Sequence, residues 1–554
     1  MADNLELAAR IRAARNYARI KQKDMAKKLS VSIETYGRIE AGTRPASDEE
    51  LAIISEACTP ATDRTWIVCL QSRSAVRIAD NMQVNILASP QSEHSVRIHV
   101  QDSMQKHDLD SPDASTLPDG PEVTARPLRA LDLFAGAGGL SRGFEWAGAG
   151  RVVGAVEIDE AAADTFRANH PDARVWTEDI RKVDPLAVGR ELGPIDVVLG
   201  GPMCQGVSQR GPRDPHDDRN FAFWAFADYV RKLKPQFFLM ENVPAIASDV
   251  HNRRLAIAVF EELESLGYHL SAEVVCAAWF GVPQLRYRLV VLGSLDRQPA
   301  FPACVAAGIE ARMSEGDFVG VGAAIGDLPR VASGGGLDDR PMPRAPRSLS
   351  PYAAMLRGDA ERLYNHWSAD TAAVNLDRIR HVPEGGNWHD IPLDVLPPRF
   401  REVRLSDHTT TYRRLDREHP AHVITCLCGN VTAGAFTHPT QHRAITVREA
   451  ARLQGFPDAH RFVGPRSSQY RQVGNAVPAL MARRLATALV SDDADAAWNG
   501  GAPSVEVGWT GRVTLDVLKR YPDRRLPFTL APRYKALFGT RVHRRRQDLE
   551  PAAA

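Results

Sequence analysis

The 554-residue sequence contains little cysteine, and neither sign of charge is in excess. Its seven cysteines are odd in number and scattered, which does not suit a disulfide framework and predicts a reduced, cytoplasmic protein. The sequence has no apolar run long enough to cross a membrane and no secretory signal, so we expect no membrane association. The formal net charge of +1 excludes an overall basic field, and any nucleic-acid surface must therefore be local.

The cysteine spacing also speaks against a metal site. Cys426 and Cys428 are too close together for the usual Cys-x-x-Cys knuckle, and no second pair matches them. The alternation Cys-Leu-Cys predicts a strand instead. We therefore expect no bound metal.

The first 60 residues carry several short helical patterns. Apolar residues recur at helical spacing near the start, and a second short helix is predicted over Gln22 to Leu29. Ser30-Val31 forms a tight turn, and Ser32 is an N-cap for a third helix through Ala41. Two short helices joined by a tight turn form a helix-turn-helix.

This segment resembles the Cro/repressor-like helix-turn-helix domain, with Ile39-Glu40-Ala41-Gly42 and Arg44-Pro45 where that family has them. The resemblance implies that the third helix enters the major groove of DNA. The side chains expected to touch DNA are Gln22, Ser32, Thr35 and Arg38. An excess of arginine and lysine suits contacts with phosphates. A small helical protein-protein module is the alternative.

The next stretch, residues 61–127, joins this domain to the rest. Strands are predicted at Thr65–Leu70 and Ser95–Val100. Residues Gln101–Arg126 are rich in Asp, Ser and Pro and lack periodicity, which indicates a flexible linker.

From Leu128 the chain alternates strands and helices, and it reads as an α/β domain. A strand enters the glycine-rich turn Phe134-Ala135-Gly136-Ala137-Gly138, where a ligand can approach the backbone. The next strand ends in Glu157-Ile158, and an acid there suits a ribose diol. A third strand ends near Asp179. This order predicts a nucleoside site, but alone it does not distinguish S-adenosylmethionine from a dinucleotide.

Three further motifs follow. The buried strand Asp196–Leu199 runs into Gly-Gly-Pro-Met-Cys-Gln, which presents Cys204. The strand after it ends in Glu241-Asn242-Val243, and Gln284-Leu285-Arg286-Tyr287-Arg288 precedes another strand. Singly, Glu241 could be a helix-capping acid and the arginines a surface clamp.

Taken in order, together with Gly474-Asn475-Ala476-Val477-Pro478, these motifs resemble the DNA cytosine-5 methyltransferases. The match covers Leu128 to Val490. It implies a Rossmann-like S-adenosylmethionine-dependent methyltransferase fold with a smaller target-recognition domain, beside the all-α N-terminal domain. It also implies double-stranded DNA as the substrate.

The family resemblance assigns four catalytic residues. Cys204 would add as a thiolate to carbon 6 of cytosine, turning the ring into an enamine whose carbon 5 can accept a methyl group. Glu241 would hold the ring at nitrogen 3, and Arg286 and Arg288 would favour the thiolate and contact the base and its backbone. The base must leave the stack, since carbon 6 is unreachable inside a duplex.

The cofactor residues are carried over in the same way. Phe134 would pack near the adenine, Gly136 and Gly138 would make the close turn, and Glu157 would bind the ribose. Ile158 would form an apolar wall, and Asp179 would bond the adenine amine. Asn475 would complete the methionine pocket. Met203 departs from the family, which has proline there; we expect a more mobile loop and an active enzyme.

The expected division of the chain has six parts. They are a helix-turn-helix domain (1–60), an appendage with linker (61–127), a cofactor-binding domain (128–293), a target-recognition region (294–440), the end of the catalytic domain (441–490) and a C-terminal extension (491–554). Thr446 begins a capped helix that ends at Gly-Phe-Pro. The basic run Arg541–Arg546 is either a phosphate contact or a solvated tail.

We expect a monomeric catalytic part, a helix-turn-helix that can dimerise, and binding to the gene's own promoter as a self-regulating device. The enzyme is expected to act in restriction-modification or as a solitary methylase. Two alternatives stay open: an RNA cytosine-5 methyltransferase, and a catalytically weak DNA-binding regulator.

Overall fold

The computed structural model describes residues 26–40, 47, 126–202, 221–248, 250–305, 318–400, 403, 407–491, 497–498 and 515–520. The chain divides into two compact units, residues 1–103 and 104–554, and each is described by itself. Several predicted features lie outside the described residues: Gln22, Cys204, the strands at 65–70 and 95–100, and the basic run 541–546.

In the first unit, helix α3 (Ile33–Glu40) is the expected third helix. The Ser32 Oγ accepts a hydrogen bond from the backbone N–H of Thr35 at 3.0 Å, which confirms the predicted N-cap. Ser30 has φ 56, in the tight turn before it. The side chains that pack inside this part are Ala26, Leu29, Tyr36 and Ile39.

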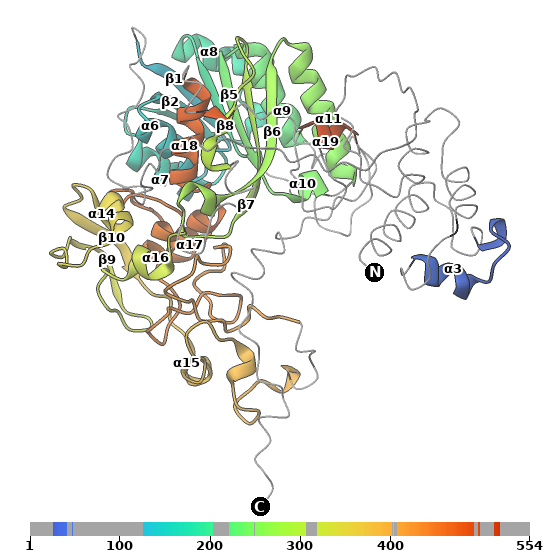
Figure 1. Ribbon diagram of the computed structural model, residues 1–554. Helices are drawn as coiled ribbons and strands as arrows, with labels where there is room; N and C mark the ends of the chain where they lie inside the picture. Colours follow the sequence, from blue (N-terminus) through green and yellow to red (C-terminus); the bar gives the residue numbers. More distant parts are fainter. Residues whose placement is uncertain are drawn as a thin grey trace, which may run out of the picture. The chain divides into compact units, whose positions relative to one another are not determined.

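A seven-stranded sheet forms the centre of the second unit (Figure 1). Its strands are β1 Leu128–Leu133, β2 Gly150–Glu157, β3 Arg174–Thr177, β4 Val197–Gly200, β5 Phe237–Asn242, β6 His269–Cys276 and β7 Tyr287–Ser294. They lie in the order β3-β2-β1-β4-β5-β7-β6, and β7 is antiparallel to both neighbours. The predicted Rossmann-like sheet is confirmed, and its order reverses between β1 and β4, where such sheets bind ligands.

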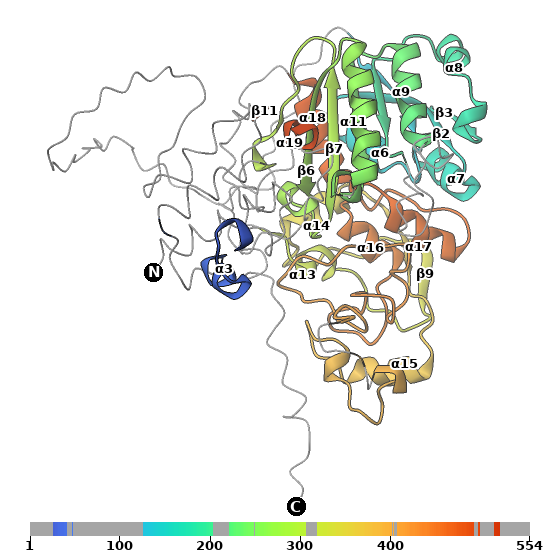
Figure 2. The same ribbon diagram turned by 90° about the vertical axis from the view of Figure 1, so that its right-hand side faces the viewer.

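Helices cover both faces of the sheet, so its strands are apolar on both sides. They are α6 Gly139–Trp146, α7 Glu160–Asn169, α8 Pro185–Leu192, α9 Phe221–Leu233, α10 Ala245–Ser248, α11 Val250–Ser265 and α18 Ala479–Val490. One hydrophobic core joins α6, α7 and α18 to one face, and a second joins α8, α9 and α11 to the other. Figure 2 looks onto α9 and α11.

Alternate residues of the strands face opposite sides of the sheet. In β1, Ala130 packs into the first core, whereas Leu131 and Leu133 pack into the second, as the two-residue repeat of a strand requires. Two short 3-10 helices follow strands: η1 Ile180–Lys182 and η4 Ala277–Phe280.

Residues 294–475 contain the predicted target-recognition region (294–440) and are called the recognition half below; their elements are shorter. They are β8 Phe301–Pro302, α13 Val321–Ile325, β9 Gly336–Pro341, α14 Pro351–Arg357, β10 Arg362–Trp367, α15 Ala373–Arg380, η6 Trp388–Asp390, η7 Pro398–Phe400, α16 Val447–Leu453 and α17 Arg466–Asn475. Strands β9 and β10 form an antiparallel pair. Near α15, a third core gathers Ile379, Trp388, Phe400 and Tyr412.

Two segments beyond residue 491 are described. Strand β11 (Ala497–Trp498) pairs with β8, and helix α19 (Leu515–Arg520) packs its buried Leu518 into the core formed by α11 and β6. Lys519 forms an ion pair with Glu264 of α11. This part of the C-terminal extension is therefore docked on the sheet.

One strand prediction is wrong. Residues 426–429 form a turn, because the N–H of Cys428 donates to the carbonyl of Thr425 at 3.1 Å. Cys428 is buried, and Leu427 is exposed. The two cysteines therefore do not share one face, as they would in a strand, because Cys426 is exposed and Cys428 is buried.

Candidate active site

The glycine-rich turn after β1 begins the site. Phe134 and Gly136 have φ 57 and 55, and Gly138 has φ 81 at the start of α6. A left-handed backbone suits glycine, since other residues rarely adopt it. The next residue, Gly139, lies so close to Val477 that a Cβ would sit 2.2 Å from its carbonyl oxygen. The backbone at Val477, which is distant in sequence, therefore packs directly against this turn.

Glu157 ends β2 and faces this turn. Its Oε2 accepts the backbone N–H of Gly136 at 2.7 Å, and its Oε1 accepts that of Asp159 at 2.8 Å. Burial raises the pKa of Glu157, and these backbone hydrogen bonds oppose the rise. A carboxylate has about four acceptor positions, so Glu157 can still accept a hydrogen bond from a ligand hydroxyl.

Ile158 and Asp179 follow β2 and β3. The Ile158 side chain is 60% exposed, which is unusual for an apolar residue beside a pocket. The Asp179 carboxylate pairs with Arg181, and this hydrogen bonding lowers the pKa of Asp179. Asp179 caps the 3-10 helix η1 two residues beyond the end of β3, so it lies slightly later than the strand end predicted for it.

A cavity of about 580 Å³ joins these groups. Six of the seven predicted cofactor residues line it: Phe134, Gly136, Glu157, Ile158, Asp179 and Asn475. Gly138 does not line the cavity and instead starts α6. Gly201 and Glu241 also line it, so the cavity reaches the predicted catalytic residues.

Sequence reasoning missed Asp132, which also lines the cavity. Its Oδ2 accepts the Ser141 hydroxyl at 2.6 Å, whereas its buried Oδ1 has no hydrogen-bond partner among the described residues. Burial raises the pKa of Asp132 to about 7. An unsatisfied buried carboxylate oxygen on a residue that lines a cavity suits a cationic group on a ligand. The sequence signal that could have identified Asp132 is an acidic residue within an otherwise apolar strand.

The nucleophile segment leaves β4 beside β5. The amide of Asn242 donates to the carbonyl of Pro202 at 2.6 Å, which fixes the last described residue before the predicted nucleophile. A Cβ on Gly201 would lie 3.7 Å from the Oε2 of Glu241. Cys204 itself lies outside the described residues, but the chain leading to it starts beside Glu241.

Glu241 and Arg288 form a pair. The Arg288 Nε lies 2.7 Å from the Glu241 Oε1, and both side chains are largely buried. The pair connects β5 to β7, which are adjacent antiparallel strands. Two of the predicted catalytic residues are therefore in contact.

Arg286 is held differently. Its Nη1 donates to the carbonyl of Ile424 at 2.9 Å and to that of Gly474 at 3.2 Å. Burial, and next the charge of Arg288, lower the pKa of Arg286, while Glu241 opposes them. Arg286 thus joins Ile424 and the Gly474 motif to the segment that leads into β7.

A sequence model of the C-5 cytosine-specific DNA methylases matches residues 128–491. This chain belongs to that family. The type II methyltransferase M.DdeI of Desulfomicrobium norvegicum is 32% identical over 369 residues, which cover 65% of this chain and 88% of that protein. The type II methyltransferase M1.HphI of Haemophilus parahaemolyticus is 34% identical over 370 residues, covering 66% and 87%. The predicted DNA cytosine-5 methyltransferase is confirmed.

A helix-turn-helix model matches residues 6–61 of this methylase. Of the predicted DNA-reading residues, Ser32 uses its hydroxyl as the N-cap, and it also hydrogen-bonds the Thr35 hydroxyl at 2.8 Å. Arg38 is exposed and forms an ion pair with Glu34 one turn earlier. The arginine is therefore at the surface of α3, where DNA can reach it.

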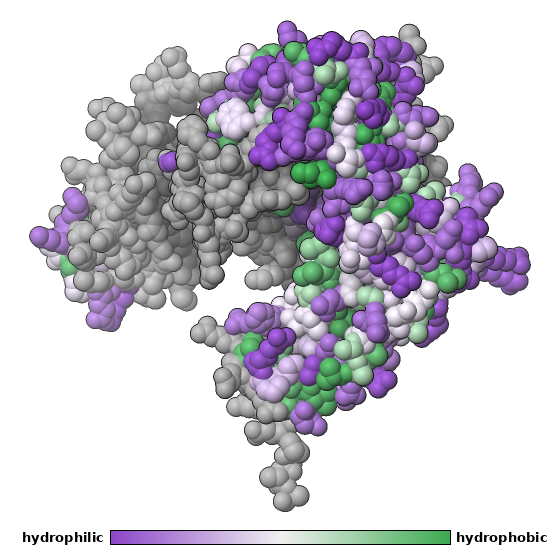
Figure 3. All heavy atoms as spheres, turned by 180° about the vertical axis from the view of Figure 1, so that it is seen from behind, coloured by the Kyte–Doolittle hydropathy of each residue, from purple (hydrophilic) through white to green (hydrophobic). Residues whose placement is uncertain are grey.

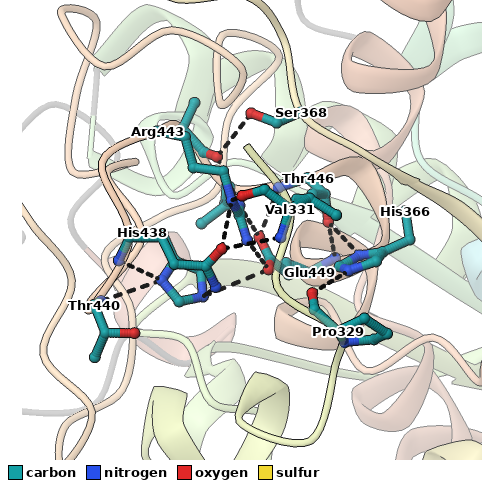
Figure 4. A network of polar contacts seen from close by, with 12 residues as sticks. Pro329, Val331, His366, Ser368, His438, Thr440, Arg443, Thr446 and Glu449 are labelled. Atoms are coloured by element: carbon teal, nitrogen blue, oxygen red, sulfur yellow. Dashed lines mark hydrogen bonds and ion pairs between the residues drawn. The ribbon is translucent and has the colours of Figure 1, made fainter. Parts of the chain in front are cut away.

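The recognition half of the methylase rests on a buried polar network (Figure 4). Arg443 donates from Nη1 and Nη2 to both oxygens of Glu449, each at 2.7 Å. Glu449 also accepts the N–H of Thr446, which completes a capping box at the start of α16 and confirms the predicted helix cap. His366 bonds Thr446 and the carbonyl of Pro329, so β10 joins the network.

Among the described residues, no helix is long and apolar enough to span a membrane. In the same part of the chain, no cluster of three or more His, Cys, Asp or Glu residues could hold a metal.

Proposed function

We propose that this chain transfers a methyl group from S-adenosylmethionine to carbon 5 of a flipped cytosine in double-stranded DNA, through Cys204. The observation that carries the proposal is the shared cavity: the cofactor residues and Glu241 line one space, which ends at the start of the Cys204 segment. The type II methyltransferases similar to this chain support a role in restriction-modification.

The residues present fit the cofactor. Glu157 offers acceptors for a ribose diol, Ile158 an exposed apolar wall for the adenine, and the unsatisfied Asp132 oxygen a partner for a positive charge. Asn475 also lines the cavity. When bound, S-adenosylmethionine supplies an electrophilic methyl group on a sulfonium.

The base would be activated by this chain's own groups. Cys204 attacks carbon 6 of the cytosine as a thiolate, and Glu241 holds nitrogen 3, which makes carbon 6 more electrophilic. Arg288 keeps the Glu241 carboxylate in place through their 2.7 Å contact. Arg286 positions the surrounding backbone. After methyl transfer to carbon 5, a base removes the proton from carbon 5, and the thiolate leaves.

Transfer of a labelled methyl group to DNA, compared with tRNA, tests the substrate. We expect labelling of DNA alone, and none with Cys204→Ser. Labelling of tRNA instead would move the chain to the RNA branch, and labelling of neither by well-folded protein would leave a DNA-binding regulator.

The helix-turn-helix has a separate role in our proposal. We infer that residues 1–60 bind the gene's own promoter as a dimer, because the catalytic motifs form a complete set within residues 128–490. Added nonspecific affinity for substrate DNA is the simpler rival. Footprinting upstream of the gene, with the full chain and with residues 127–554, separates the two. A protected palindrome for the full chain only supports regulation, while loss of methylation in the truncated chain supports substrate binding.

A further inference from the structure

A turn from the recognition half lies against the catalytic motifs. Both backbone polar groups of Ile424 bond to the arginine motif: its N–H donates to the Gln284 Oε1 at 2.9 Å, and its carbonyl accepts from the Arg286 Nη1 at 2.9 Å. Gln284 and Arg286 are both buried. Ile424 is therefore held against the segment that leads into β7.

The peptide between Thr425 and Cys426 packs against Gly474, in the motif that ends at Pro478. A Cβ on Gly474 would lie 2.2 Å from the carbonyl carbon of Thr425 and 2.3 Å from the nitrogen of Cys426. Only glycine permits this approach. Asn475, which follows Gly474 in the sequence, lines the cofactor cavity. The turn therefore packs against a residue whose next neighbour lines that cavity.

The turn itself, residues 425–428, is internally bonded. The N–H of Cys428 donates to the carbonyl of Thr425, and the N–H of Leu427 donates to the Thr425 hydroxyl at 3.3 Å. The N–H of Asn430 donates to the carbonyl of Leu427 at 2.9 Å. Cys428 is fully buried, yet the Leu427 side chain is 56% exposed at the tip of this fixed turn.

Single exposed leucines are common, so the location decides what this one means. On the face seen in Figure 3, hydrophilic side chains predominate and hydrophobic ones form small separate patches. Two exposed apolar side chains, Leu427 and Val243, adjoin the segments that hold Arg286 and Glu241. Ile158, exposed in the cofactor cavity, shows the same pattern at a ligand site.

We infer that Leu427 inserts into the DNA stack at the target base pair and fills the space that the extruded cytosine leaves. The inference rests on the proposed function. Extrusion loses the stacking of the target base, and an apolar side chain between base steps replaces part of it. A turn that is already closed by its own hydrogen bonds adds little ordering cost on binding. Duplex DNA is the occupant because the turn borders the groups that act on its base.

The experiment compares Leu427→Ala with wild-type enzyme on two duplexes, after the wild-type target has been mapped at base resolution. One duplex has the target cytosine paired with guanine, and the other has it opposite an abasic site, where extrusion is already easy. We expect Leu427→Ala to lose tenfold or more in kcat/KM on the paired duplex and to recover to within twofold of wild type on the abasic duplex. Leu337→Ala, which removes a leucine of similar exposure from β9, should stay within twofold on both.

A second measurement reads extrusion without chemistry. With 2-aminopurine at the target position, wild-type enzyme should raise the fluorescence clearly more than Leu427→Ala does. Unchanged activity of Leu427→Ala on the paired duplex, equal losses on both duplexes, or an unchanged fluorescence response would overturn the inference. Absence of methylation by the wild-type enzyme on every duplex would instead contradict the proposed function, and the fluorescence arm would still test the insertion.

Discussion

Around the cofactor cavity, backbone groups make most of the decisive contacts. Glu157 is held by two backbone N–H groups, and Gly139 meets a backbone carbonyl. In the recognition half, buried charged side chains take that role: Arg443 pairs with Glu449, and Arg452 pairs with Asp327 and Asp458. The comparison teaches that networks of buried ion pairs can hold short elements together where no large sheet is present. Such a network stabilises the fold only while every buried charge keeps its partner.

Removing one charge from the recognition half should have the largest effect. Glu449→Gln leaves Arg443 buried without its partner, so the free energy of unfolding should fall by about 3–5 kcal/mol. Urea denaturation measures it. The control Glu178→Gln breaks an exposed pair with Lys182 and should leave stability unchanged within error. If both variants lowered the free energy of unfolding by the same small amount, the buried ion pairs would not stabilise the recognition half as described.

The same pair predicts an acid dependence. Burial alone would raise the pKa of Glu449, but Arg443, and next His438, outweigh it and hold the pKa below its ordinary value of 4.5. Because the folded pKa is depressed, the contribution is present above about pH 4.5 and is lost as the pH falls. The acid limb of the stability curve should therefore be shallower in Glu449→Gln.

Glu157 tests the cofactor half. Glu157→Ala removes acceptors for the ribose diol, and such a hydrogen bond contributes about 1.5–3 kcal/mol. S-adenosylmethionine affinity should fall roughly tenfold or more by calorimetry. Unchanged affinity would contradict the role of Glu157, while a loss of stability without a loss of affinity would assign it to the turn alone.

Gly139 tests the close approach of the chain's far end. The added methyl of Gly139→Ala meets the backbone oxygen of Val477, and overpacking of this kind costs about 1–3 kcal/mol. Gly189→Ala in α8 meets only the tip of Leu233 and should be neutral or stabilising. Thermal unfolding distinguishes the two variants. Equal transition temperatures would show that Gly139 and Val477 are packed less closely than described.

Asp132 gives the smallest effect. Since burial raises the pKa of Asp132 to about 7, the neutral form prevails below pH 7 and the carboxylate above it. Binding of the cationic cofactor should strengthen as the pH rises from 6 to 8, by at most about 1.4 kcal/mol, because the ionised fraction rises about tenfold. Asp132→Asn should flatten this dependence and, in the absence of cofactor, stabilise the protein at pH 8. A wild-type affinity that is constant with pH would refute the contact.

Much of the cofactor half could be predicted from sequence because strand periodicity, glycine turns and strand-end acids are local signals. The caps at Ser32 and Thr446 were local as well. The clamp by Arg286 joins residues 138 and 188 positions apart, and no local pattern encodes such a contact. The strand prediction at Cys426-Leu427-Cys428 failed because three residues are too few for a two-residue period to identify a strand, and a hydrogen bond from the Cys428 N–H to the Thr425 carbonyl closes a turn there.

The covalent role of Cys204 is the centre of this account, and trapping on DNA with 5-fluorocytosine at the target position tests it most directly. Fluorine blocks the elimination that releases the enzyme, so the wild-type protein should form a denaturation-resistant adduct in the presence of S-adenosylmethionine, and peptide mapping should place it at Cys204. An adduct at another cysteine, or no adduct from enzyme that methylates ordinary DNA, would contradict the mechanism.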